Sequence, residues 1–124
     1  VVKAENDLRN ARHTLTMGDD CPYDTVCFHP QQCAEKYLKA MLCHVGIDFP
    51  HIHDLGELVM LLPADTSWFP LSIDERERLS DYAVATRYPP EEEAIERADA
   101  DDAVGLALRV REAVRARLPQ HVLD

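Results

Sequence analysis

Gln32, Glu35 and Lys39 follow one another at spacings of three and four residues, and Lys36 lies beside them. In a helix this spacing places the first three side chains on one face. A glutamine amide both donates and accepts hydrogen bonds, and a lysine ammonium is a point charge suited to phosphate. The alternative is an ordinary solvated face, on which Glu35 and Lys39 form an ion pair worth about 0.3 kcal/mol. The stripe is therefore a candidate binding surface.

Two residue pairs elsewhere in the chain add groups of the same kind. His53-Asp54 precedes an apolar helical pattern, and a helix start offers N–H groups and a positive end that suit phosphate. Asp54 is also a typical N-cap, and His53 either acts as an acid or base or holds a backbone carbonyl. Arg87-Tyr88 stands at a helix end, where Arg87 either forks onto a phosphate or a carboxylate of a dimer mate, or complements the helix dipole. The candidate nucleotide- or partner-binding residues are Gln32, Glu35, Lys36, Lys39, His53, Asp54, Arg87 and Tyr88.

Other kinds of site find little support in the residue pattern. The cysteines and histidines near the candidate stripe lack the tight C-x2-C pairs of structural zinc sites. Glycine is too sparse for a phosphate-binding loop, and no Ser/His/Asp order is present. The four cysteines are expected to be reduced and mostly buried. We therefore expect no metal ion, no cofactor and no catalytic residues.

Length, composition and charge narrow the class of protein. A chain of 124 residues with 46% apolar and 29% charged residues is typical of one soluble globular domain, here residues 1–124. No apolar run approaches the ~20 residues of a membrane-spanning helix, and no signal peptide pattern is present. We therefore expect a cytoplasmic protein that does not enter a membrane. The net charge of −10 opposes broad binding to a polyanion, so we expect no DNA binding, while a small local basic site stays compatible.

The elements that must position these side chains are helices. Apolar residues recur at spacings of three and four in five segments, and no segment alternates as a strand does. Pro30 lies inside the second segment, so either that helix kinks or its regular part starts near His29. Ser72 and Glu75 form a capping-box pattern, and Asp99 is expected to cap the last helix. The expected helices cover about 3–17, 24–45, 54–62, 72–87 and 99–118, and short connections between them predict an all-α, up-and-down antiparallel bundle of four to five helices.

Four blocks of the sequence resemble the HEPN domain (higher eukaryote and prokaryote nucleotide-binding) over nearly the whole chain. They are Ala4, Asp7, Leu8 and Ala11; Phe28-His29, Gln32, Ala34-Glu35-Lys36 and Leu38-Lys39-Ala40; His53-Asp54-Leu55; and Tyr82 with Thr86-Arg87-Tyr88-Pro89. The resemblance implies a bundle of four or five helices that is usually dimeric. It also implies a function beside a minimal nucleotidyltransferase, in a two-component or toxin–antitoxin module.

Many proteins that share this resemblance are metal-independent ribonucleases with an arginine followed four to six residues later by a histidine. Arg115 and His121 fit that spacing, but chance also gives such a match, and Pro119 interrupts the helix between them. We interpret the motif as absent and predict a non-catalytic subunit, a homodimer that binds a nucleotide or RNA and works with a nucleotidyltransferase. Two alternatives stay open: a ribonuclease with a divergent pair, Arg87 with His53 or His29, or a pure protein-interaction module.

Overall fold

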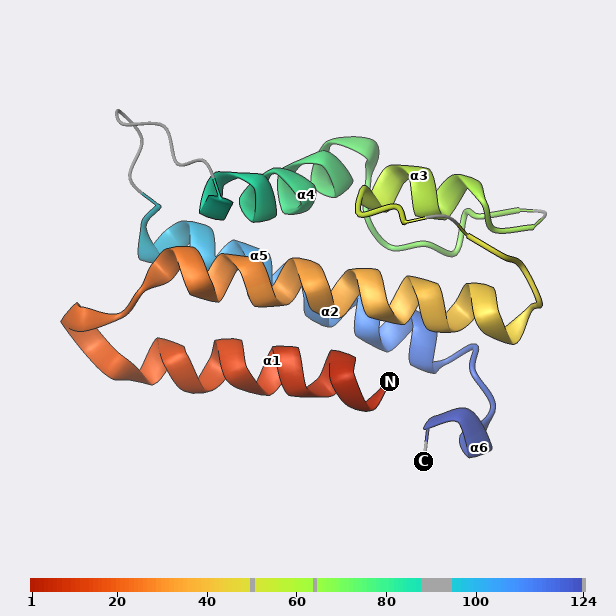
Figure 1. Cartoon of the computed structure of the whole chain (residues 1–124), viewed down its shortest axis with the longest axis horizontal. Coiled ribbons are helices and arrows are strands. Elements are labelled where there is room, and N and C mark those ends of the chain that lie inside the picture. Colours follow the sequence, from red (N-terminus) through yellow and green to blue (C-terminus); the bar gives the residue numbers. More distant parts are fainter. Residues whose placement is uncertain (50, 64, 88–94, 124) are drawn as a thin grey trace.

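The computed structural model describes residues 1–49, 51–63, 65–87 and 95–123, apart from the side chains at 19, 20, 24 and 83–87 (Figure 1). These residues form helices and no strand. The elements are α1 Val2–Thr14, the 3₁₀ helix η1 Leu15–Asp20, α2 Tyr23–His44, α3 Leu55–Met60, α4 Ile73–Arg87, α5 Arg97–Arg115 and α6 Gln120–Leu123. The predicted all-α bundle is confirmed, and the short α6 is an element that the periodicity did not predict.

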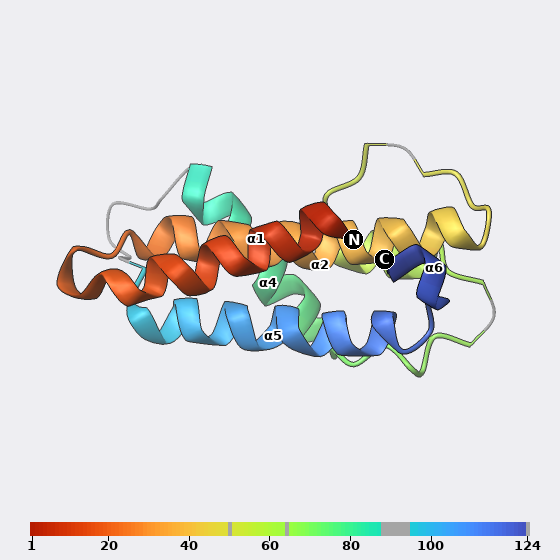
Figure 2. The same ribbon diagram turned by 90° about the horizontal axis from the view of Figure 1, so that it is seen from below.

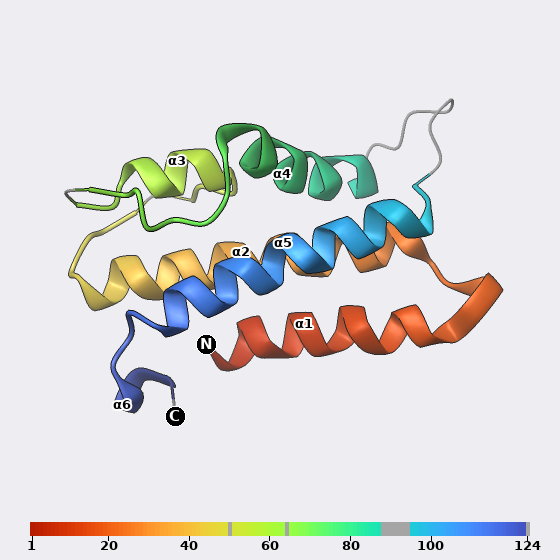
Figure 3. The same ribbon diagram turned by 180° about the vertical axis from the view of Figure 1, so that it is seen from behind.

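Helix α2 runs through the middle of the bundle. It packs against α1, α4 and α5 and, near its C-terminal half, against α3 (Figure 1). The long helices α1 and α4 run opposite to α2 and α5, and the view from behind shows α5 lying across α2 (Figure 3). Because neighbours cover α2 on several sides, even Gln31 and Glu35 on this helix are buried. Buried polar groups need hydrogen-bond partners, so the position of α2 dictates a polar network within the bundle.

Local signals decide where α2 begins and ends. The helix continues through Pro30, and seven residues of helix precede the proline. Of the two alternatives for this proline, a regular helix that starts near His29 was therefore wrong. At its C-terminal end, Gly46 takes a φ of 77°, which favours glycine. The N–H groups of Gly46 and Ile47 then donate to the carbonyls of Cys43 and Leu42, at 3.1 and 2.9 Å. This Schellman motif stops the helix and turns the chain back towards α3.

Two of the three predicted caps are confirmed. Asp54 Oδ1 accepts from the Glu57 N–H at 3.0 Å. The Glu75 N–H donates to Ser72 Oγ at 3.1 Å, and the Ser72 N–H donates to Glu75 Oε1 at 2.9 Å. The third was wrong, because α5 begins at Arg97 and Asp99 lies inside its first turn. Asp99 Oδ2 there accepts from the N–H of the N-cap residue Glu96 at 3.0 Å, so the carboxylate closes a capping box from the helical side.

The Glu75 carboxylate couples the start of α4 to α5 and should make stability depend on acid. Hydrogen bonds from Arg109 and from the Ser72 N–H lower the pKa of Glu75 from 4.5 to about 2. A lowered pKa contributes stability that is complete above the unfolded value and is lost as the pH falls through the folded one. We therefore expect Glu75→Gln to destabilise by a constant amount from about pH 5 to 8, and by progressively less from about pH 4 downwards. Urea unfolding at several pH values measures this difference, and exposed Glu77→Gln is the control. A difference that does not change with pH would contradict the assignment.

Candidate functional site

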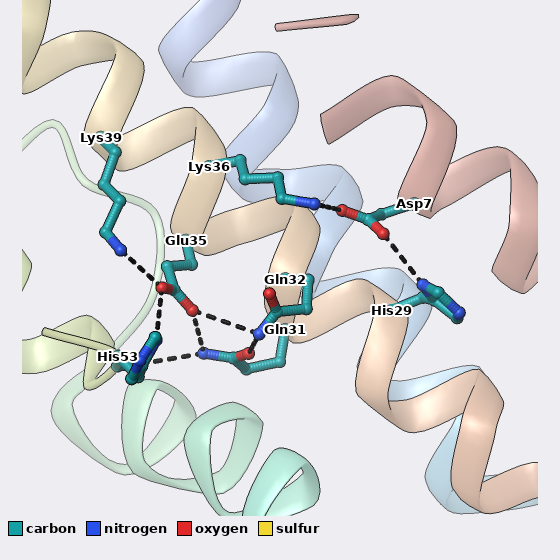
Figure 4. A network of polar contacts seen from close by, with 8 residues as sticks. All are labelled: Asp7, His29, Gln31, Gln32, Glu35, Lys36, Lys39 and His53. Atoms are coloured by element: carbon teal, nitrogen blue, oxygen red, sulfur yellow. Dashed lines mark hydrogen bonds and ion pairs between the residues drawn. The ribbon is translucent and has the colours of Figure 1, made fainter. Parts of the chain in front are cut away.

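The carboxylate of Glu35 is the centre of the polar network on α2 (Figure 4). Oε1 accepts from Lys39 Nζ at 2.7 Å and lies 2.7 Å from His53 Nδ1. Oε2 accepts from Gln31 Nε2 at 3.1 Å and from Gln32 Nε2 at 3.3 Å. Only 4% of the Glu35 side chain is exposed. A carboxylate removed from water to this extent requires such compensation, and here both oxygens receive it.

This arrangement corrects one sequence expectation. The sequence made Gln32, Glu35 and Lys39, with Lys36 beside them, a candidate binding surface, whereas Glu35 is buried beneath its neighbours. The chain that leads into α3 lies over this face of α2, and the His53 carbonyl touches it. Spacing within one helix does not reveal which loop will cover it. The groups nearer to solvent are therefore His53 and, to a smaller extent, Lys39, with exposed side-chain fractions of 65% and 22%.

Gln31 was missed by the sequence analysis, although it is the most buried polar residue of the network. It is 1% exposed. Its Nε2 donates to Glu35 and, at 2.9 Å, to the carbonyl of His53, and its Oε1 accepts from Gln32 Nε2 at 2.7 Å. Gln31 therefore ties the chain before α3 to α2. Its position four residues before Glu35 was the available signal, but Gln31 gains its role only when the α3 segment packs against it.

His53 is held through its ring nitrogen Nδ1, and within the described part of the chain Nε2 makes no hydrogen bond. A carboxylate only accepts hydrogen bonds, so Nδ1 carries the proton that it donates to Glu35. In the neutral ring this leaves Nε2 as an acceptor, and in the protonated ring Nε2 is a donor. One alternative from the sequence was that the His53 ring bonds to a backbone carbonyl. In the structure the ring bonds to the Glu35 carboxylate instead. A carboxylate-oriented, largely exposed imidazole is chemically suited to hydrogen bonding with a ligand or to proton transfer.

Lys39 completes the charge balance of the cluster. Its ammonium contacts Glu35 and lies 5.6 Å from the centre of the Phe49 ring. One lysine and one glutamate cancel, so the cluster is uncharged while His53 is neutral. Recognition here would depend on directed hydrogen bonds more than on net charge.

Lys36 belongs to a different contact set. Its Nζ lies 2.5 Å from Asp7 Oδ2 on α1, and Asp7 Oδ1 lies 2.9 Å from His29 Nδ1. Figure 4 shows Lys36 reaching away from Glu35 towards α1. Lys36 and Asp7 thus clamp α1 to α2, and Lys36 does not join the Glu35 cluster.

The remaining predicted residues are placed as follows. Asp54 lies next to His53 in the chain, but its Oδ1 serves the N-terminus of α3. The side chain of Arg87 and the whole of Tyr88 lie outside the described residues.

Arg115 and His121, the two residues that match the ribonuclease spacing, lie in different surroundings. Arg115 Nη1 donates to Tyr37 Oη at 3.1 Å and lies 3.6 Å from Glu5 Oε1, whereas His121 is exposed in α6. Burial, and then the hydrogen bond to Glu5, raise the pKa of Tyr37 to about 12. Burial acts to raise the pKa of Glu5, but its bonds with Arg111 and Tyr37 together lower it. Arg115 is therefore engaged in a structural network that joins α1, α2 and α5.

The described part of the chain offers neither a metal-binding cluster nor a membrane-spanning helix. It has no set of three or more His, Cys, Asp or Glu side chains placed to hold a metal ion. None of its helices combines the length and the apolar character needed to span a membrane. None of the four cysteines, all of them in the described residues, forms a disulfide bond; Cys43 is exposed, and Cys21, Cys27 and Cys33 are buried.

Comparison with known proteins places the sequence and the fold in a family. The family model of the HEPN domain matches residues 1–117. The chain belongs to the HEPN domain family. Its structure is similar to that of TT1696 from Thermus thermophilus, with a TM-score of 0.76 and 30% identity over 94% of this chain and 93% of that one. It is also similar to ST0689, an archaeal HEPN homologue, with a TM-score of 0.70 and 29% identity over 93% and 91% of the two chains. No curated protein matches the sequence.

Membership of the HEPN family explains the most characteristic sequence block in physical terms. The block from Phe28 to Ala40 lies on α2, the helix that the rest of the HEPN bundle surrounds. Small and apolar residues of the block, such as Cys33 and Ala34, let the neighbouring helices approach. Its polar residues build the Glu35 cluster and the Lys36–Asp7 clamp.

Proposed function

We propose that this HEPN protein is a non-catalytic subunit that binds a nucleotide or RNA. It acts with a minimal nucleotidyltransferase in a two-component, toxin–antitoxin-like module. The observation that supports binding is the exposed His53 imidazole, held by a buried carboxylate beside Lys39. Burial on one side and exposure on the other fix the direction of its free nitrogen, which reduces the entropy lost when a ligand binds.

The chemistry of the Glu35 cluster suits the polar edge of a base or a ribose. His53 Nε2 accepts or donates according to its protonation, and the Lys39 ammonium donates. The cluster carries little net charge, so it would discriminate by hydrogen bonding. A site of this kind rejects a ligand that leaves its polar groups unpaired.

The proposed setting is a cytoplasmic homodimer that docks the nucleotidyltransferase. Family membership supports this setting, and the charge of −10 suits a protein partner at least as well as a long polyanion. Co-purification of the tagged chain with the product of the neighbouring gene tests the partnership. Recovery of the chain alone, under conditions in which both proteins are expressed and folded, would reject it.

Replacement of His53 tests the binding site directly. We expect His53→Ala to weaken nucleotide or RNA binding by about two- to tenfold, because a hydrogen bond between neutral groups contributes roughly 0.5–1.5 kcal/mol. Exposed His51→Ala is the matched control, two residues earlier in the chain. Isothermal titration with a panel of nucleotides and a short RNA measures both variants. Equal affinities for His53→Ala and His51→Ala would remove the Glu35 cluster as the site.

A second candidate function, a divergent metal-independent ribonuclease, is favoured by the same histidine. A carboxylate that orients an exposed imidazole is an arrangement that general acid–base catalysis uses. The proposal would require an arginine partner, for which Arg87 or a residue of a second copy is the candidate. RNA cleavage that is lost in His53→Ala and kept in His51→Ala would support this function over the non-catalytic one.

A further inference from the structure

A hollow lined by residues of α1 lies apart from the Glu35 cluster. It has a volume of about 410 Å³ and is lined by Glu5, Leu8, Arg9, Arg12 and His13. These residues follow one another at helical spacing, so they share one face of α1. Figure 2 shows α1 and α5 running side by side.

The basic side chains of this hollow are not engaged by carboxylates. Arg9 Nη1 makes one long bond, 3.5 Å, to Asn6 Oδ1. Among the described residues, Arg12 and His13 have no side-chain partner. Arg9, Arg12 and His13 are exposed. In a chain of net charge −10, two unpaired arginines beside a histidine are a local excess of positive charge.

The one acidic residue that lines the hollow is already neutralised. Glu5 Oε1 accepts from Arg111 Nε at 2.6 Å and from the Tyr37 hydroxyl, and Arg115 Nη1 lies 3.6 Å away. The side chains of Arg111 and Arg115 are each 30% exposed. Two arginines against one glutamate leave this end of the hollow with a net positive charge, so Glu5 does not oppose an anion there.

We propose that this hollow, with Arg111 and Arg115 at its Glu5 end, binds a ligand that carries two or more phosphates. Seven residues separate Glu5 from Arg12, about 10 Å along a helix that rises 1.5 Å per residue. One phosphate cannot reach both ends, whereas a triphosphate chain or successive phosphodiesters can. Arginine is the suitable side chain, because its planar fork donates two parallel hydrogen bonds to a phosphate.

This inference rests on the proposed function for the source of the phosphates, a nucleotide or RNA, and adds a second contact surface to it. The Glu35 cluster supplies directed hydrogen bonds and almost no charge. The α1 hollow supplies positive charge and little shape complementarity. The long-range field of the chain repels a polyanion, so binding in the hollow depends on close contacts and falls steeply with salt.

A charge reversal with a matched control tests the hollow. The full chain is titrated with inorganic tripolyphosphate and, separately, with a labelled single-stranded RNA. We expect Arg12→Glu to weaken tripolyphosphate binding by about tenfold or more, since it removes one charge-assisted bond and adds a repulsion. Lys3→Glu makes the same change of charge on an exposed residue of α1 that does not line the hollow, and it should weaken binding by less than about twofold. For RNA, removal of Arg12 should lower the slope of log K against log salt by about 0.7.

The outcomes separate this inference from the proposed function. The proposal of a phosphate site in the hollow would be overturned if Arg12→Glu and Lys3→Glu weakened binding equally. It would also be overturned if the wild type bound neither tripolyphosphate nor RNA. Nucleotide binding that depends on His53 and is indifferent to Arg12 would do the same and leave the proposed function standing. Tripolyphosphate binding that depends on Arg12 supports the hollow even if no partner co-purifies. Tighter binding of RNA than of tripolyphosphate would identify RNA as the source, and the reverse would identify a nucleotide.

Discussion

Replacing Glu35 with alanine is expected to reduce the free energy of unfolding by about 2–4 kcal/mol. The carboxylate is 4% exposed and receives hydrogen bonds from Lys39, His53, Gln31 and Gln32. Its removal leaves the Lys39 ammonium without its counter-ion and takes one acceptor from the buried amide of Gln31 and one from the half-buried amide of Gln32. Breaking a buried ion pair from one side is costly because the remaining charge is uncompensated.

Urea unfolding of three variants distinguishes this cause from a general effect of substitution. Glu35→Gln keeps the size and one acceptor oxygen, so it should cost less than Glu35→Ala. Exposed Glu112→Ala on α5 should change stability by no more than about 0.5 kcal/mol. If Glu35→Ala were as mild as Glu112→Ala, the network of Figure 4 would not contribute to stability.

Removing the Tyr37 ring is expected to have the largest effect, a loss of about 3–5 kcal/mol for Tyr37→Ala. Tyr37 is fully buried on α2, and its hydroxyl donates to Glu5 on α1 and accepts from Arg115 on α5. Tyr37→Phe keeps the ring and removes only the hydroxyl, so it should cost about 1–2 kcal/mol. The difference between the two variants separates packing from hydrogen bonding.

The same hydroxyl predicts a loss of stability at high pH. The pKa of Tyr37 rises from 10.0 to about 12, through burial first and the bond to Glu5 second. A folded-state pKa above the unfolded one gives stability that is complete below pH 10 and is lost as the pH rises towards 12. Tyr37→Phe should remove this part of the alkaline loss. An unchanged alkaline profile in Tyr37→Phe would exclude Tyr37 as its source.

The long helices could be predicted because periodic apolar residues record burial directly. Leu8 and Ala11 on α1, or Val110 and Val114 on α5, are buried on the face that their spacing indicated. The predicted helix ends were less accurate where a side chain could take part in capping from either of two positions. Asp99 looks like an N-cap in the sequence, but Glu96, three residues earlier, occupies that position.

The candidate site was predicted in part, for a physical reason. The sequence spacing correctly predicted that Gln32, Glu35 and Lys39 lie together, because all three residues belong to one helix. The burial of Glu35, the role of Gln31 and the turn of Lys36 towards Asp7 depend on segments from other parts of the chain. The α1 hollow escaped notice because Arg9 and Arg12 resemble any exposed basic pair until the partners of Glu5 are known.

The central place of α2 has a consequence for synthesis on the ribosome. When α1 and α2 have emerged, the nascent hairpin still exposes the apolar residues that α4 and α5 later cover, and the amide and carboxylate groups that the segment before α3 satisfies. Arg111 and Arg115, which lock α1 onto α2 through Glu5 and Tyr37, are translated about a hundred residues after α1. Contacts between residues so far apart in the sequence delay cooperative folding and leave an aggregation-prone intermediate. Chaperone capture of the growing chain should therefore end only once α5 is complete.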